Sequence, residues 1–310
     1  MRILLTGSGG FLGQSIMPVL SQGHTVIGFR SDEWDLRSQS RCEDLINMSN
    51  PDVVIHAAGS VGGIGANQEN PGKFIYENLI MGVNVIHEAM KQNVSKLILL
   101  GTVCAYPKHT PVPFKEEDLW DGYPEETNAP YGIAKKSLMK MVETYNEQYG
   151  LNGVNLIPVN MYGPHDHFNL TTSHVIPALI LKIYNAMRNG EKSITLWGTG
   201  QVSREFLYAP DCAQAIKMAV EKDIPPSPIN IGTGNEIKIC DLVKEIADQM
   251  GFEGDILYDP NKPDGQPRRC LDVSKAKEVL GFEAKTSFQQ GLKETIEWFL
   301  QQDEPEGGGS

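Results

Sequence analysis

The feature that most constrains this chain is a glycine-rich segment directly after an apolar N-terminal run. Residues 2–6 predict a short buried strand, and residues 11–21 carry apolar side chains at helical spacing. Between them Gly7, Gly10 and Gly13 follow a G-x-x-G-x-x-G spacing. The first glycine permits a tight turn, the second lets the backbone approach a pyrophosphate, and the third lets the helix pack closely on the strand. The segment therefore predicts a dinucleotide-binding site.

The rest of the chain alternates short apolar runs with helical patterns. Strands are predicted over residues 24–29, 52–56, 96–100, 153–158 and 229–232, and helices over residues 78–90, 134–149, 175–188, 241–250 and 288–300. Such alternation with short connections predicts an α/β fold with a Rossmann-type doubly wound parallel sheet. The pattern changes after Tyr162-Gly163-Pro164, where a long irregular stretch begins. A smaller, mainly C-terminal α/β lobe is therefore expected to bind the substrate.

These patterns set the expected domains. Residues 1–164 with about 203–234 would form the NADP-binding Rossmann domain, and about 165–202 with 235–303 the substrate-binding lobe. Residues 304–310 are expected to be a tail, because Gly307-Gly308-Gly309-Ser310 is typical of a flexible linker.

Composition limits the partners and the compartment. A formal net charge of −12 argues against nucleic acid or an anionic membrane as a large-surface partner. No segment reaches the roughly 20 apolar residues of a membrane span, and the N-terminus lacks the pattern of a secretory signal. The five cysteines are scattered and odd in number, which favours reduced thiols in a cytoplasm over a disulfide framework. We expect a cytoplasmic protein.

The cofactor preference depends on the end of the second predicted strand. In NAD-preferring proteins a carboxylate usually stands there and binds the ribose 2′-hydroxyl. This chain carries Arg30 instead, and a guanidinium suits a 2′-phosphate, so NADP(H) is the predicted cofactor. A solvated surface arginine is the alternative, since Asp32 and Glu33 follow. The other residues expected to contact the cofactor are Phe11, Leu12, Ala57, Ala58, Tyr131, Lys135 and Asn160.

Tyr131 and Lys135 form a Y-x-x-x-K pair at the start of a predicted helix, which places both side chains on one face. A free phenol has a pKa of roughly 10, and a nearby ammonium favours the phenolate and brings the group closer to working pH. The phenol can then give a proton to a carbonyl oxygen as a hydride arrives. Thr102 follows the predicted strand 96–100, whose carboxyl end should line the ligand crevice. Its hydroxyl could hold the substrate oxygen, or it could be a turn threonine.

Several further segments are distinctive. They are Val61–Asn67, Phe74–Asn78, Cys104–Lys108, Thr127–Tyr131, Ser173–Leu179, Trp197–Gly200, Arg204–Leu207 and Lys262–Gly265. On these segments the chain resembles the GDP-L-fucose synthase family of extended short-chain dehydrogenases/reductases. The resemblance covers essentially residues 1 to 300.

The resemblance implies a dual-function epimerase and reductase. That family inverts carbons 3 and 5 of GDP-4-keto-6-deoxy-D-mannose and reduces its 4-keto group with NADPH, which yields GDP-L-fucose. The matching positions make Thr102, Tyr131 and Lys135 the reductase set, and Cys104 and His174 the epimerase acid/base pair. A thiol and an imidazole both titrate near neutrality, so each can transfer protons. An inert thiol and a helix N-terminal histidine are the structural alternatives.

The nucleotide end of the substrate requires cations. The resemblance assigns Arg204 to the diphosphate, and Lys182, where relatives often carry arginine, and Arg268 are further candidates. Trp197 would pack on the sugar or the base, and His174 would also contact the substrate.

The resemblance also bears on metals and assembly. His165-Asp166-His167 is a weak metal signal, and because the family uses no metal, none is expected. Relatives are homodimers joined through two helices per subunit. Here those helices would be about residues 78–91 and 134–149.

Four alternative functions stay open. Departures near the sugar, at His167, Asn169 and Leu170, leave a related GDP-6-deoxy-4-keto hexose or heptose as the substrate. A reductase whose Cys104/His174 pair no longer epimerises is the second. An NAD-dependent nucleotide-sugar 4-epimerase is the third, and a cofactor-binding sensor without turnover is the fourth.

Overall fold

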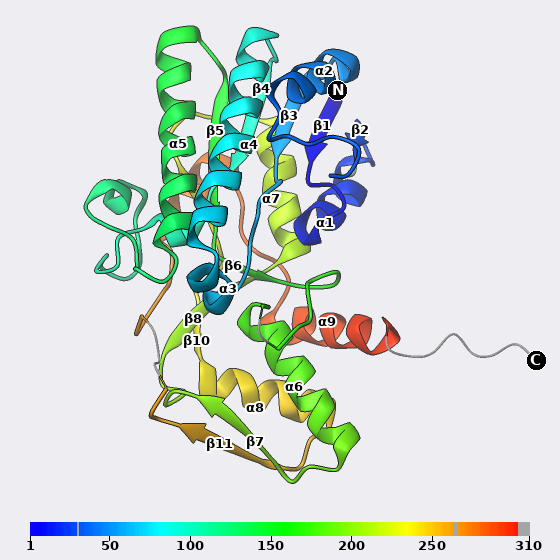
Figure 1. Ribbon diagram of the computed structural model, residues 1–310, viewed down its shortest axis with the longest axis vertical. Helices are drawn as coiled ribbons and strands as arrows, with labels where there is room; N and C mark the ends of the chain where they lie inside the picture. The colour runs from blue at the N-terminus through cyan, green and yellow to red at the C-terminus, as the bar shows by residue number, and fades with distance from the viewer. Residues whose placement is uncertain (30, 171, 263–265, 303–310) are drawn as a thin grey trace, which may run out of the picture.

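A computed structural model describes residues 1–29, 31–170, 172–262 and 266–302 (Figure 1). Its centre is a six-stranded parallel sheet in the order β2-β1-β3-β4-β5-β9. The strands are β1 (Arg2–Thr6), β2 (Thr25–Gly28), β3 (Val53–His56), β4 (Lys96–Leu100), β5 (Gly153–Pro158) and β9 (Ile229–Ile231). The strand order reverses between β1 and β3, which opens a crevice at the carboxyl ends of these strands. The predicted fold class is confirmed.

Two helical layers accompany the sheet. The first holds α1 (Phe11–Leu20) and α7 (Ala209–Glu221), and the second holds α2 (Gln39–Ser49), α4 (Pro71–Lys91) and α5 (Ala129–Tyr149). The last two helices run side by side (Figure 1). Both begin earlier than predicted because a proline stands in their first turn, where its missing N–H breaks no helical hydrogen bond. Tyr131 therefore lies in the first turn of α5.

A smaller lobe lies below this sheet in Figure 1. It contains α6 (Val175–Asn189), α8 (Ile239–Met250), α9 (Phe288–Gln302) and a parallel pair of strands, β7 (Ser193–Trp197) and β11 (Asp255–Asp259). A third sheet connects the lobes in the order β10-β8-β6, with bounds Glu236–Lys238, Ser203–Tyr208 and Asn160–Tyr162. The remaining elements are α3 (Ile64–Glu69), two 3₁₀ helices (Val103–Ala105 and Glu116–Trp120) and a π-helix (Ala276–Leu280).

Each lobe has its own buried core. The core of the larger lobe is formed by the apolar strands and the inner faces of its helices. The smaller core includes Ile180, Ile183, Leu196, Val243, Ile246 and Leu292. This arrangement follows the predicted division of the chain, whose boundaries stay a prediction. Among the described residues, no helix combines the length and the apolarity needed to cross a bilayer.

Candidate active site

The glycine loop after β1 has no room for side chains at two positions. Gly7 has a φ of 73°, and a Cβ on it would lie 2.8 Å from the Cα of Ala58. A Cβ on Gly13 would overlap the carbonyl oxygen of Gly7. The first glycine therefore permits the turn towards the loop after β3, and the other permits α1 to approach the strand.

The N-terminus of α1 is suited to bind an anion. Gly10 is the N-cap, followed by Phe11 and Leu12, and within the described residues 10–14 no side chain caps the helix and no acidic residue stands in its first turn. The orphan N–H groups and the positive end of the helix dipole remain available for a pyrophosphate. The residues present therefore fit the dinucleotide that the glycine spacing predicts.

A second loop is tied to the first by Thr6. The Thr6 Oγ1 lies 2.9 Å from His56 Nδ1 and accepts a 3.1 Å hydrogen bond from the backbone N–H of Ala58. Burial lowers the pKa of His56 to about 3, so the ring is neutral and serves this contact. The structure thus places Ala57 and Ala58 beside the glycine loop.

Asn160 is also expected to contact the cofactor. It donates a 3.1 Å hydrogen bond from its Nδ2 to the carbonyl oxygen of Glu205.

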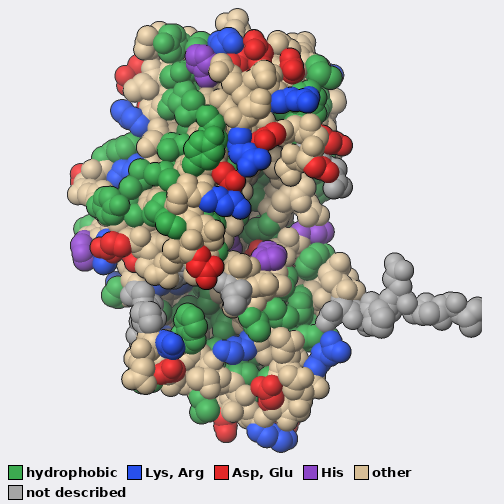
Figure 2. All heavy atoms as spheres, viewed as in Figure 1, with side chains coloured by type: hydrophobic (Ala, Val, Ile, Leu, Met, Phe, Trp, Pro, Cys, Tyr) green, Lys and Arg blue, Asp and Glu red, His purple; other side chains and the backbone are tan. Residues whose placement is uncertain are grey.

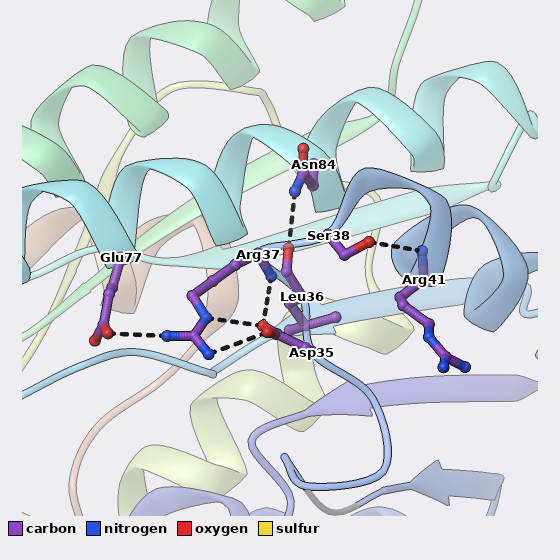
Figure 3. Close-up of polar contacts among 7 residues, drawn as sticks. All are labelled: Asp35, Leu36, Arg37, Ser38, Arg41, Glu77 and Asn84. Atoms are coloured by element: carbon purple, nitrogen blue, oxygen red, sulfur yellow. Dashed lines mark hydrogen bonds and ion pairs between the residues drawn. The ribbon is translucent and has the colours of Figure 1, made fainter.

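The segment after β2 is held by α4 (Figure 3). Arg37 donates to both carboxylate oxygens of Asp35, from Nε at 2.9 Å and from Nη2 at 3.0 Å, and pairs with Glu77 at 3.2 Å. Asn84 donates a 2.8 Å hydrogen bond to the carbonyl oxygen of Leu36. These contacts fix the backbone of this segment, and they occupy the Arg37 guanidinium.

The predicted 2′-phosphate ligand, Arg30, lies outside the described residues. A second arginine near this segment, Arg41, was not predicted. Its guanidinium lies 5.9 Å from the ring centroid of Trp34, and in the part of the chain that the structure describes it forms no ion pair. Figure 3 shows its side chain pointing away from the Asp35–Arg37 pair. The only sequence signal for Arg41 is its position in the first turn of α2. A surface arginine is common at such a position, so this signal does not indicate a cofactor ligand.

The predicted catalytic groups converge where β4 ends and α5 begins. Lys135 is buried and donates a 3.1 Å hydrogen bond from Nζ to the carbonyl oxygen of Leu100. The backbone N–H of Cys104 donates to Thr102 Oγ1 at 3.2 Å, and the Cys104 thiol is close enough to Tyr131 to influence its ionisation. The structure thus brings all four predicted residues of the β4–α5 junction together.

The protonation states differ in part from the prediction. Burial lowers the pKa of Lys135 to about 8. We expected an ammonium to bring the Tyr131 phenol closer to working pH, but this is wrong for the structure: burial raises the pKa of Tyr131, and the Thr102 hydroxyl only partly opposes this. Burial of the phenol is the main cause, and the nearby Cys104 thiol adds to it. Tyr131 is therefore a protonated phenol at neutral pH, the form that can give a proton.

His174 lies at the junction of the two lobes as the N-cap residue of α6, without capping it through its side chain. The residue is exposed at its surface, and desolvation by the surrounding atoms, together with the neighbouring His167, lowers its pKa. The backbone N–H of Gly63 donates to the carbonyl oxygen of Thr172 at 2.8 Å. The loop after β3 therefore meets the loop that carries His174.

The predicted substrate cations are spread over the smaller lobe. Lys182 donates from Nζ to the carbonyl oxygen of Thr195, and Arg204 donates from Nη1 to the carbonyl oxygen of Ser203 at 2.7 Å. Trp197 is 71% exposed, and the Nζ of Lys262 lies 5.5 Å from its ring. The exposed indole is available to stack on a ring of a ligand.

Of two adjacent arginines, the one we did not predict faces the catalytic groups. Arg268 is exposed and pairs with Glu236, with 2.9 Å between its Nε and Oε1. Arg269 is buried, and its Nη1 lies 3.6 Å from the Cys104 Sγ. Two consecutive arginines carry no local signal for which of them faces inward.

The His165-Asp166-His167 segment has structural partners. The His165 ring lies 5.0 Å from that of Trp298, and His167 Nε2 lies 3.0 Å from Thr172 Oγ1. Asp166 is buried, and burial raises its pKa to about 7. Among the residues described, no three His, Cys, Asp or Glu side chains are placed to hold a metal ion.

Fold and site define a nicotinamide-dependent short-chain enzyme, and comparison with known proteins agrees. The profile of the NAD dependent epimerase/dehydratase family matches residues 3–232, and the chain belongs to this family. It is 40% identical over 300 residues to a GDP-L-fucose synthase of Sinorhizobium fredii, covering 96% of this chain and 95% of that protein. It is 39% identical over 311 residues to a GDP-L-fucose synthase of Escherichia coli, covering 97% of each chain.

Solved structures of nucleotide-sugar enzymes have a similar fold. A GDP-L-fucose synthetase from Naegleria fowleri bound to NADP superposes with a TM-score of 0.88 at 28% identity, over 97% of this chain and 94% of that one. A GDP-6-OMe-4-keto-L-xylo-heptose reductase from C. jejuni superposes with a TM-score of 0.90 at 28% identity, over 97% of this chain and 98% of that one.

Proposed function

We propose that this enzyme converts GDP-4-keto-6-deoxy-D-mannose to GDP-L-fucose, by epimerisation at carbons 3 and 5 followed by NADPH-dependent reduction of the 4-keto group. The chain is an NADP-dependent nucleotide-sugar oxidoreductase with epimerase activity. The observation that carries the proposal is the meeting of Thr102, Cys104, Tyr131 and Lys135 at the junction of β4 and α5. GDP-L-fucose synthases among its relatives support the substrate.

The cofactor is NADP(H), which the similar Naegleria fowleri structure binds. The loop Gly7–Gly13 would hold the pyrophosphate on the free N-terminus of α1, next to Ala58. We assign the 2′-phosphate to Arg30, predicted from the sequence, with Arg41 as a second cation. When bound, the dinucleotide supplies the hydride that reduces the keto carbon.

The reductase step needs one proton, and Tyr131 can give it to the keto oxygen. Its phenol is protonated at neutral pH, and Thr102 lies beside it to orient that oxygen. As the proton leaves, negative charge forms on the phenol oxygen. The buried ammonium of Lys135, four residues along the same helix, stabilises that charge.

Epimerisation needs a base on one face of the sugar and an acid on the other. We assign these roles to Cys104 and His174. The 4-keto group acidifies the protons on carbons 3 and 5, so a thiolate can remove them. Desolvation and the neighbouring His167 lower the pKa of His174 when the substrate is absent. An anionic diphosphate or a thiolate nearby opposes this and favours the imidazolium, which can return a proton.

The test is turnover of GDP-4-keto-6-deoxy-D-mannose with NADPH in deuterated water. One NADPH should be consumed per GDP-L-fucose formed, with deuterium at carbons 3 and 5. Reduction without deuterium would mean a reductase that does not epimerise. Turnover without net NADPH consumption would mean a 4-epimerase. If the enzyme consumes a related GDP-4-keto heptose but not GDP-4-keto-6-deoxy-D-mannose, the heptose replaces the deoxymannose as the proposed substrate.

We infer a homodimer joined through α4 and α5. The two helices lie side by side, and hydrophobic side chains gather over them in Figure 2. Tyr76, Val83 and Tyr149 on these helices are exposed. Sedimentation equilibrium should give twice the chain mass. A monomer at micromolar concentration would contradict the inference.

We place the enzyme in the cytoplasm. All five cysteines, Cys42, Cys104, Cys212, Cys240 and Cys270, are free. Free thiols are typical of reducing compartments. Recovery of the protein in the soluble intracellular fraction tests this location, and recovery from the periplasm or the medium would contradict it.

A further inference from the structure

A buried guanidinium contacts the thiol of the candidate active site. The side chain of Arg269 lies in the interior, and its Nη1 is 3.6 Å from the Cys104 Sγ. This distance is within the range of a hydrogen bond to sulfur. No local pattern in the sequence gives this arginine a role, and the proposed reaction does not require it.

The charge of Arg269 lacks a carboxylate partner among the residues described. Its Nε and Nη2 donate to the amide oxygen of Gln266 at 3.2 and 3.0 Å, and its Nη1 faces Cys104. Burying a cation beside neutral groups alone costs free energy. An anion at the position that the Arg269 Nη1 faces would offset this cost. The group at that position is the Cys104 thiol, which becomes an anion when it loses its proton.

The arginine is also held rigidly. Its carbonyl oxygen accepts a 3.1 Å hydrogen bond from the N–H of Glu205 on β8, and the next residue but one, Leu271, donates its N–H to the Glu205 Oε2 at 2.7 Å. Gln266 Nε2 donates to the carbonyl oxygen of Lys108 at 2.8 Å, in the loop after Cys104. The guanidinium is therefore preorganised beside the sulfur and needs no rearrangement to meet a negative charge.

We propose that Arg269 is a positioning residue that holds Cys104 as the thiolate, the form that removes protons from the carbons beside the keto group. The inference rests on the proposed function. The Nη1 of Arg269 contacts the Cys104 Sγ, and the Tyr131 phenol on the first turn of α5 lies near the same thiol. Tyr131 is neutral at working pH, so it neither stabilises nor repels the thiolate as a charge. Arg269 is then the cation that contacts the Cys104 sulfur.

The test measures the ionisation of Cys104 in the full-length protein without substrate. Alkylation of Cys104 by iodoacetamide, followed by mass spectrometry across pH, gives its pKa. Arg269→Gln should raise this pKa by about 1 to 3, the usual effect of removing a close opposite charge. Arg269→Lys, which keeps the charge, should restore most of the shift. Arg268→Gln, which removes a cation from the exposed neighbouring position, is the matched control and should leave the pKa of Cys104 within experimental error.

Two further readouts separate this role from a structural one. In deuterated water, Arg269→Gln should slow exchange at carbons 3 and 5 about tenfold or more at neutral pH, and recover as the pH rises towards the new thiol pKa. Reduction of the already epimerised 4-keto sugar should change by less than about threefold, because Tyr131 and Lys135 remain in place. Near-ultraviolet circular dichroism checks that each variant folds.

Three outcomes would overturn the inference. One is an equal Cys104 pKa in the wild type, Arg269→Gln and Arg269→Lys proteins. Another is a loss confined to substrate KM, which would make Arg269 a diphosphate ligand. The last is a glutamine variant that does not fold, together with a folded lysine variant whose Cys104 has a higher measured pKa than that of the wild type. A pKa that depends on Arg269 in an enzyme that incorporates no deuterium would support the pairing and reject the proposed epimerisation instead.

Discussion

The ammonium of Lys135 donates a 3.1 Å hydrogen bond to the carbonyl oxygen of Leu100, the last residue of β4. This contact fastens the first turns of α5 to the carboxyl end of the central sheet. Tyr131, four residues earlier on the helix, is thereby held beside Thr102, two residues beyond the strand. One hydrogen bond therefore positions the proposed proton donor, Tyr131, close to the Thr102 hydroxyl.

The pH dependence of reduction should report Lys135. Burial lowers the pKa of this lysine from 10.5 to about 8. Only the charged form of Lys135 stabilises the phenolate that Tyr131 becomes after it gives its proton. The kcat/KM for NADPH, which reflects the free enzyme, should therefore fall as pH rises through about 8. The free energy of unfolding should not decrease together with kcat/KM. Between pH 8 and 10.5 the unfolded chain holds the Lys135 proton and the folded protein does not, so this residue adds stability as the pH rises.

Lys135→Arg supplies the matching control for that pH profile. A guanidinium stays protonated throughout this range, so the decline near pH 8 should disappear, although the altered geometry lowers the rate at neutral pH. Rates and thermal unfolding are measured on the same samples from pH 6 to 10. An unchanged decline near pH 8 in the arginine variant would assign it to another group.

Tyr131→Phe should abolish reduction and keep cofactor binding. The substitution removes the proton donor while preserving the ring, and loss of a general acid typically costs about 10²- to 10⁴-fold in rate. We expect a fall in kcat of that size, with a Kd for NADPH, measured by fluorescence titration, within about threefold of the wild type.

Tyr123→Phe serves as the comparison, because Tyr123 is 62% exposed on the loop before α5 and makes no side-chain contribution to the site. Its kcat should stay close to that of the wild type. Normal reduction by the Tyr131 variant would remove Tyr131 from the role of proton donor.

Glu205→Gln should destabilise the protein through the connection between the lobes. Glu205 is fully buried on β8, and its carboxylate accepts backbone hydrogen bonds from Thr233 at 2.5 Å, Gly234 at 2.8 Å and Leu271 at 2.7 Å. An amide replaces one acceptor oxygen with a donor, so at least one of these buried N–H groups loses its partner, at a cost of about 1–3 kcal/mol.

Urea unfolding measures that cost, with Glu253→Gln as the control, because Glu253 is exposed. A change in the free energy of unfolding no larger than in the control would show that the site relaxes around the amide.

The sequence predicted the central sheet, and it named the residues that the structure brings together at the junction of β4 and α5, because both predictions used local patterns. The expected strands over residues 96–100 and 153–158 coincide with β4 and β5, which are mainly apolar and are buried along their whole length. The convergence of Thr102 and Tyr131 follows from one residue ending a strand and the other beginning a helix. The positions of both residues can be read from local patterns, although their meeting also uses the hydrogen bond between Lys135 and Leu100.

The parts that the sequence did not predict depend on distant contacts. β6 and β10 have three residues each, too few for a periodic signal, and form only by pairing with β8. Arg269 is turned inward, and Arg268 outward, because the backbone of Arg269 pairs with Glu205 across 64 positions of the chain. No local feature distinguishes two adjacent arginines, so this assignment required the structure.

Gly7→Ala should weaken NADPH binding and destabilise the fold together. Gly7 has a φ of 73°, and its added Cβ would lie 2.8 Å from the Ala58 backbone, so the turn must open on both counts. A non-glycine residue held in this region costs about 1–3 kcal/mol, which the shift in Tm should show, and the Kd for NADPH should rise at least tenfold because the loop after β3 is displaced. Gly9→Ala is the control in the same loop, since nothing lies within 4 Å of the corresponding Cβ. Its Tm and Kd should remain near the wild-type values, and equal effects of the two alanines would show that the tight turn at Gly7 is not what shapes the cofactor site.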